Sequence, residues 1–137
     1  KIIHQSKLLN YFIEKKEISK IEKETNDLLK NILKDKKYVI TTNDEILLES
    51  LKYDGVKILK KYSDRYSPTA NIPPDIQAKI NDRKLGLILL RIVEIIGEDK
   101  INNLGSETLN FVLIVLNQLD LDQIRNKIIL KTLPIRV

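Results

Sequence analysis

The single histidine, His4, is the only imidazole that the chain offers for acid–base or metal chemistry. The sequence contains no cysteine, which excludes disulfides, thiolate metal sites and thiol nucleophiles. A structural zinc site needs four nitrogen or sulfur ligands, and one histidine cannot supply them. His4 falls in the first turn of the expected first helix, near a chain end that we expect to fray. A catalytic triad built on it is therefore disfavoured.

Three pairs of neighbouring carboxylates are candidates for acid–base catalysis or cation binding. They are Asp44 with Glu45, Glu98 with Asp99, and Asp120 with Asp122. All three pairs lie at expected helix ends, where acidic side chains cap the helix or complement its dipole. The spacing after Asp120 does not continue as an EF-hand loop, and the glycines form no phosphate-binding loop. We predict no catalytic residue, no metal site and no cofactor.

The most apolar stretch of the chain runs from Leu85 to Ile96, LGLILLRIVEII, and its only charges are Arg91 and Glu94. Residues three apart share a helix face, so these charges form one narrow polar stripe. A structural salt bridge between helices explains them better than a catalytic pair. Because a helix that is apolar nearly all round is usually covered by protein, we expect helix 84–96 to be a central helix of the fold. More narrowly, we expect it to be the middle of a C-terminal helical unit, residues 74–133.

The composition is typical of one soluble globular domain. The chain has 137 residues, of which 42% are hydrophobic and 31% charged, and its net charge is +5. The lysines that dominate this charge alternate with glutamates, as on a solvated helix face. No apolar run approaches the ~20 residues that span a bilayer, and no signal peptide is visible. The first residue is Lys1 rather than Met, so we interpret the chain as a fragment or a processed product, either cytoplasmic or periplasmic.

Residues 2–35 are predicted to be helical, as one helix or two, and the second part of the range is amphipathic. Its apolar positions step by three and four residues, and they are Ile18, Ile21, Thr25, Leu28 and Ile32. This seam spans only about two heptads, short of the three or four that establish a coiled coil. The pattern favours a helix that packs on its own domain, with a partner helix or a homo-oligomer through residues 18–32 as the alternative.

A second helical region begins at Thr42, where Thr42 and Glu45 have the spacing of a capping box. Asp54-Gly55 either ends one helix and starts another, or Gly55 allows a neighbouring backbone to approach closely. The inward positions stay in phase across Gly55, which slightly favours one continuous helix to about Tyr62. Residues 67–73 contain prolines and form the expected linker between an N-terminal unit, 1–66, and a C-terminal unit, 74–137. The cluster of Tyr62, Arg65 and Tyr66 before it could stack on nucleic-acid bases, although such aromatics more often anchor a loop.

The C-terminal unit is expected to consist of paired helices. Pro74 suits the first turn of a short helix, helix 84–96 follows, and residues 106–133 form a tight antiparallel hairpin with its turn at Asp120. Asp120 and Gln123 have the spacing of a second capping box. The turn NQLDLD and the closing Pro134 resemble those of a tetratricopeptide-type repeat. This resemblance covers only the hairpin, and it implies stacked helical pairs that expose surfaces to other proteins.

We therefore expect an all-α fold of about six helices in stacked antiparallel hairpins, either solenoid-like or an irregular bundle. The expected function is a non-enzymatic module that binds another protein or the rest of a larger chain. The expected contact residues are Ile18, Ile21, Leu28, Ile32, Phe111 and Val115. RNA binding through the lysine-rich N-terminal half, with Tyr62, Arg65 and Tyr66 as contacts, is the alternative.

Overall fold

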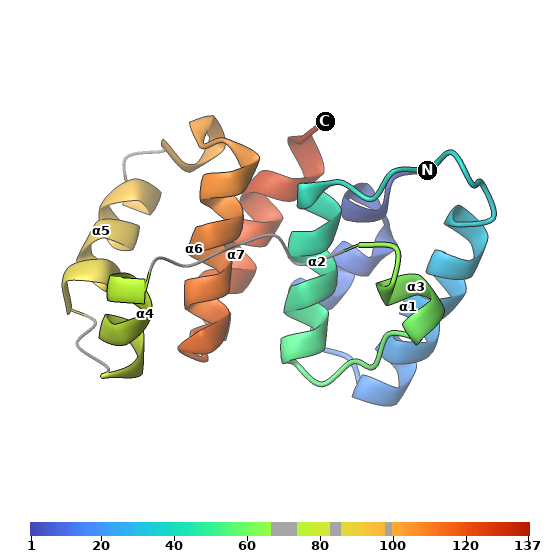
Figure 1. The fold of residues 1–137 in the computed structure, drawn as a ribbon, viewed down its shortest axis with the longest axis horizontal. Coiled ribbons are helices and arrows are strands. Elements are labelled where there is room, and N and C mark those ends of the chain that lie inside the picture. Colours follow the sequence, from blue (N-terminus) through green and yellow to red (C-terminus); the bar gives the residue numbers. More distant parts are fainter. Residues whose placement is uncertain (67–73, 83–85, 98–99) are drawn as a thin grey trace.

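The chain folds into helices joined by short loops, with no strand among the described residues (Figure 1). The structure is a computed structural model that describes residues 1–66, 74–82, 86–97 and 100–137. The α-helices in these ranges are α1 (Ile18–Ile32), α2 (Thr42–Tyr53), α3 (Lys60–Ser63), α4 (Pro74–Asn81), α5 (Gly86–Gly97), α6 (Ser106–Gln118) and α7 (Asp122–Thr132). The 3₁₀ helices are η1 (Ile3–Gln5), η2 (Lys7–Phe12), η3 (Lys100–Asn103) and η4 (Leu133–Ile135). The all-α prediction is confirmed.

The helices form an elongated row in which α2 and α6 lie side by side at the centre (Figure 1). Helix α7 packs against both α6 and η2, so the C-terminal hairpin contacts the N-terminal segment directly. Helices α1 and α3 lie at one end of the long axis, and α4 and α5 lie at the other. One core cluster runs through both expected units, 1–66 and 74–137. The expected linker, 67–73, lies outside the described residues, so the boundary itself stays a prediction.

Helix α2 begins one residue earlier than the expected capping box implies. Its N-cap is Thr41, whose hydroxyl accepts from the backbone N–H of Asp44, while Asp44 accepts from the backbone N–H of Thr41. The box therefore pairs Thr41 with Asp44 rather than Thr42 with Glu45. Both spacings are present in the sequence, and the fold selects the one in which Asp44 is also buried against other partners.

Gly55 ends α2, and the expected continuous helix to Tyr62 is wrong. Gly55 has a φ of +103°, which side-chain-bearing residues rarely adopt. The Val56 N–H donates to the Leu51 carbonyl, and the Gly55 N–H donates to the Lys52 carbonyl. These two bonds are those of a Schellman motif, which terminates the helix. Val56 and Tyr62 are nevertheless buried in the core, although the residues that join α2 to α3 are not helical.

Asp120 ends α6 with the same pair of hydrogen bonds. The Leu121 N–H donates to the Leu116 carbonyl and the Asp120 N–H to the Asn117 carbonyl, with Asp120 at a φ of 55°. Asp120 is therefore the left-handed residue after α6, and the expected capping box at Asp120 is wrong. The N-cap of α7 is Leu121, which provides no side-chain cap. The tight α6–α7 hairpin forms where it was expected.

Helix α5 is not the centre of the fold. It lies at one end of the row in Figure 1, and its main contacts among the described elements are with η3. Ile92 is buried, but Leu87 and Leu90 are 78% and 61% exposed. The expectation of an all-round covered helix is therefore wrong for this chain, because no described element packs on the outer face of α5. The side chain of Arg91 lies outside the described part of the structure.

Candidate functional site

The seam of α1 packs on its own chain. Ile21, Leu28 and Ile32 are buried in the core, and Ile18 is half-buried against it. Their burial agrees with the favoured interpretation of an amphipathic helix on its own domain. Ile21 is 1% exposed, so it presents no surface to a partner helix in this fold, and the alternative of a homo-oligomer through residues 18–32 stays a prediction. Leu28 and Ile32 nevertheless reach the floor of a groove described below.

The expected contact residues on α6 are also part of the fold. Val115 is fully buried, and Phe111 is half-buried against the core cluster. Both side chains lie on a helix that α2 and α7 contact. Val115 therefore presents no surface to a partner, and Phe111 presents only part of its side chain.

The aromatic cluster expected to contact nucleic acid is used to hold the chain together. Tyr62 and Tyr66 are each only 8% exposed. The guanidinium of Arg65 donates to the carbonyl oxygens of Leu33 at 3.2 Å and Tyr38 at 3.0 Å. Arg65 therefore ties the loop after α3 to the end of α1 and the following turn. Rings as buried as those of Tyr62 and Tyr66 are not available to stack on bases, whereas Arg65 is exposed; RNA binding through the N-terminal half stays a prediction.

His4 is buried, contrary to the expectation of a frayed terminus, and it forms an ion pair with Asp44. Its Nδ1 lies 2.5 Å from Oδ1 of Asp44, and its Nε2 lies 2.9 Å from the carbonyl oxygen of Arg136. Both ring nitrogens face acceptors, so both carry a proton and the ring is an imidazolium. The other carboxylate oxygen of Asp44 accepts from the Tyr38 hydroxyl at 2.8 Å and from the Thr41 N–H.

The pKa values of this cluster follow from those contacts. Burial lowers the pKa of His4, but the hydrogen bonds to Asp44 and to the Arg136 carbonyl outweigh it, so the pKa is raised. Burial raises the pKa of Asp44, but the hydrogen bonds from His4 and Tyr38 dominate, so that pKa is lowered. Burial and the contact with Asp44 raise the pKa of Tyr38 to about 12. The charged pair is thus the stable form between the two pKa values.

A second buried ion pair joins α7 to the end of α2. The guanidinium of Arg125, which is 1% exposed, donates to both carboxylate oxygens of Asp54 at 2.7 and 2.8 Å. The Tyr11 hydroxyl donates to Asp54 at 2.7 Å, and Arg125 also donates to the Asn117 side chain at 3.1 Å. The guanidinium carbon lies 5.7 Å from the centre of the Phe12 ring. Burial raises the pKa of Asp54, but the bonds from Arg125 and Tyr11 lower it overall.

The sequence analysis did not predict either buried ion pair, His4 with Asp44 or Arg125 with Asp54. Arg125 stands on the inward stripe of α7, between Leu121 and Ile129, and one charged residue on an apolar stripe is a signal for a buried pair. His4 follows Ile3, which is fully buried, and precedes Leu8 on the same apolar pattern. The partners could not be found in the same way, because they lie 71 and 40 residues away in the sequence.

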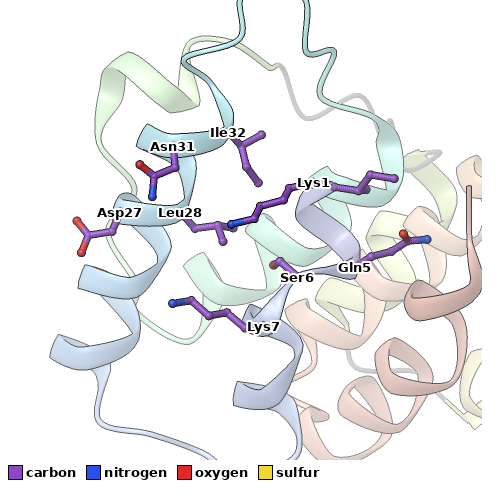
Figure 2. A pocket seen from close by; sticks show the side chains of 9 residues that line it. Lys1, Gln5, Ser6, Lys7, Asp27, Leu28, Asn31 and Ile32 are labelled. Atoms are coloured by element: carbon purple, nitrogen blue, oxygen red, sulfur yellow. The ribbon is translucent and has the colours of Figure 1, made fainter.

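A groove with a volume of about 620 Å³ lies between α1 and the N-terminal segment (Figure 2). Leu28 and Ile32 of α1 contribute its apolar floor, and Ile2, which is 38% exposed, contributes a wall. Figure 2 shows the side chains of Lys1 and Lys7 extending from the N-terminal segment toward α1. The remaining lining residues are Gln5, Ser6, Asp27 and Asn31.

Two further properties limit what the described residues can do. No group of three or more His, Asp or Glu side chains within the described ranges is placed to hold a metal ion. None of the described helices is both long enough and apolar enough to cross a membrane.

Comparison with protein-family models, curated proteins and solved structures finds no match to this chain.

Proposed function

We propose that this chain is a non-enzymatic helical-repeat module that assembles with another protein, or with the rest of a longer chain, through the outer face of α5. The observation that carries this proposal is the exposure of Leu87 and Leu90, at 78% and 61%. These leucines are three residues apart, so they lie on one face of the helix. The opposite side of α5 places Ile92 in the core, so this face is the one left for a partner.

The position of α5 supports assembly at this end of the molecule. Arrays of helical pairs bury the apolar face of each pair against the next, and a terminal unit normally presents a polar outer face. Helix α5 lies at the end of the row in Figure 1, and its outer face exposes Leu87 and Leu90 beside a single described charge, Glu94. The tetratricopeptide-like turn of the α6–α7 hairpin is consistent with a repeat architecture, although the resemblance stays a proposal.

The use of the polar side chains supports a role without catalysis. Both ring nitrogens of His4 are engaged, and the guanidinium of Arg125 is saturated by Asp54 and its neighbours. Fully paired buried groups of this kind hold elements together and are not poised to transfer protons to a substrate. The burial of His4 and Arg125 is thus explained by the ion pairs that these residues form within the fold.

A photo-crosslinking experiment tests the proposal. A benzophenone amino acid replaces Leu90, and a matched variant carries it at Lys127, which is exposed on α7. In cells of the native source, we expect a discrete cross-linked protein from position 90 and none from position 127. Adding Leu87→Lys should abolish that product while leaving the free energy of unfolding unchanged, because Leu87 is exposed. Equal or absent cross-linking at the two positions would overturn the proposal.

A further inference from the structure

We propose that the groove between α1 and residues 1–7 binds an acidic peptide segment that carries an apolar anchor side chain. This surface is separate from the outer face of α5, since α1 and α5 lie at opposite ends of the long axis in Figure 1. Binding in this groove therefore does not depend on the assembly proposed for α5. The groove is a second interaction site, with a partner of defined chemistry.

The floor and walls of the groove provide the apolar part of the site. Leu28 and Ile32 contribute to its lining although each is more than nine-tenths buried, so the groove exposes only the tips of these core side chains. Ile2, which is 38% exposed, adds a further apolar side chain to the lining. An aliphatic side chain placed here would cover this surface from water without any rearrangement of the core.

The charges at the rim determine which partner fits. The Lys1 and Lys7 side chains extend toward α1 in Figure 2, and within the described part of the chain neither ammonium forms an ion pair. The single acidic lining residue, Asp27, projects away from the two lysines in that view. The rim is thus positive next to an apolar floor, which complements carboxylates that flank an aliphatic side chain.

The polar residues of the rim favour a peptide over a simple amphiphile. Ser6 and Asn31 lie on opposite sides of the groove and offer a hydroxyl and an amide to backbone N–H and C=O groups. A peptide backbone needs such partners, whereas a hydrocarbon chain leaves them unused. The groove is also partly open to solvent rather than an enclosed cavity, so a peptide segment can enter it.

Fluorescence anisotropy with defined peptides tests this inference. The probe is a short fluorescein-labelled peptide of alternating Asp and Leu, and the controls replace Asp by Lys or Leu by Ser. We expect the wild-type chain to bind the Asp–Leu peptide and neither control. Lys7→Glu should weaken binding about five- to tenfold, because an attractive contact becomes repulsive at a partly exposed site. Lys127→Glu, which makes the same change of net charge away from the groove, should leave the affinity unchanged.

A second pair of variants tests the apolar wall without touching the core. Ile2→Ser should weaken binding of the Asp–Leu peptide, whereas Ile13→Ser should not, because Ile13 is 70% exposed and does not line the groove. Equal effects of Lys7→Glu and Lys127→Glu, or no binding of the Asp–Leu peptide by the wild-type chain, would overturn the inference. Binding of dodecanoate without binding of the peptide would also overturn it, because the occupant would then be a lipid anion.

Discussion

His4 and Asp44 form a buried ion pair that joins both ends of the chain to the start of α2. The imidazole Nδ1 and the backbone N–H of His4 both contact Oδ1 of Asp44, at 2.5 and 2.9 Å. The opposite ring nitrogen donates to the carbonyl of Arg136, near the last described residue. Asp44 also completes the capping box of α2. One carboxylate therefore orients η1, α2 and the C-terminal segment together.

The stability of the fold should depend on pH through this pair. Because the pKa of His4 is raised above its ordinary value of 6.5, its contribution is complete below pH 6.5 and is lost as pH rises through the folded pKa. The pKa of Asp44 is lowered below 3.8, so its contribution is lost as pH falls through the folded value. We expect the pair to contribute most to the free energy of unfolding between about pH 4 and pH 6.5.

Urea unfolding between pH 5 and pH 9, for the wild-type chain and for His4→Gln, measures this contribution. The difference between the two free energies of unfolding should shrink toward higher pH, because only the wild-type chain loses an imidazolium. His4 is the only histidine, so one imidazole signal in an NMR titration reports its pKa directly. A measured pKa below 6.5 would contradict the assignment of a doubly protonated ring.

Removing the carboxylate of Asp54 should strongly destabilise the fold. Asp54→Ala leaves the guanidinium of Arg125 buried without its partner, which we expect to lower the free energy of unfolding by about 3–5 kcal/mol. Tyr11→Phe removes one hydrogen bond to the same carboxylate and should lower it by about 1.5–3 kcal/mol. Chemical denaturation followed by circular dichroism measures both effects.

A double-mutant cycle separates the ion pair from simple loss of packing. Arg125→Met combined with Asp54→Ala should destabilise less than the sum of the single changes, because neither variant then buries an unpaired charge. Lys127→Ala, at an exposed position on the same helix, should change stability by no more than about 0.5 kcal/mol. Strictly additive effects of the two core substitutions would show that Arg125 and Asp54 do not act as a pair.

Asp120→Gly should stabilise the chain. Asp120 is an exposed residue with a φ of 55°, and a left-handed conformation is unfavourable for residues with a Cβ atom. Glycine removes that cost but adds freedom to the unfolded chain, so we expect a net gain of about 0.5–1 kcal/mol in the free energy of unfolding. The matched change Gly55→Ala should have the opposite sign. A Cβ at Gly55 would meet no atom within 4 Å, so its cost is that of the backbone alone.

Thermal unfolding of the two variants tests these signs together. Asp120→Gly should raise Tm and Gly55→Ala should lower it, since both positions end a helix in the same Schellman motif. A lower Tm for Asp120→Gly would mean that the Asp120 side chain stabilises the turn by contacts of its own.

Local sequence signals predicted the C-terminal helices well. Pro74 begins α4, the periodic apolar residues of α6 and α7 gave their extents to within a residue or so, and Pro134 follows the last α-helix. Caps and periodicity act within a few residues, so they can be read along the chain. The same signals misplaced the cap of α2 by one residue and extended that helix past Gly55. At both positions two local patterns compete, and only contacts with the rest of the fold decide between them.

The sequence by itself determined that the chain is all-α, that residues 106–133 form a hairpin, and that the α1 seam is amphipathic. The tertiary structure alone decided that His4 meets Asp44, that Arg125 meets Asp54, and that α5 lies at an end of the row rather than at its centre. The physical reason is that apolar surface is attracted to any other apolar surface without regard to direction. The composition of α5 therefore shows that its faces favour burial, whereas the competition among all the helices decides which face is covered. The outer face of α5, with Leu87 and Leu90, is the one left exposed.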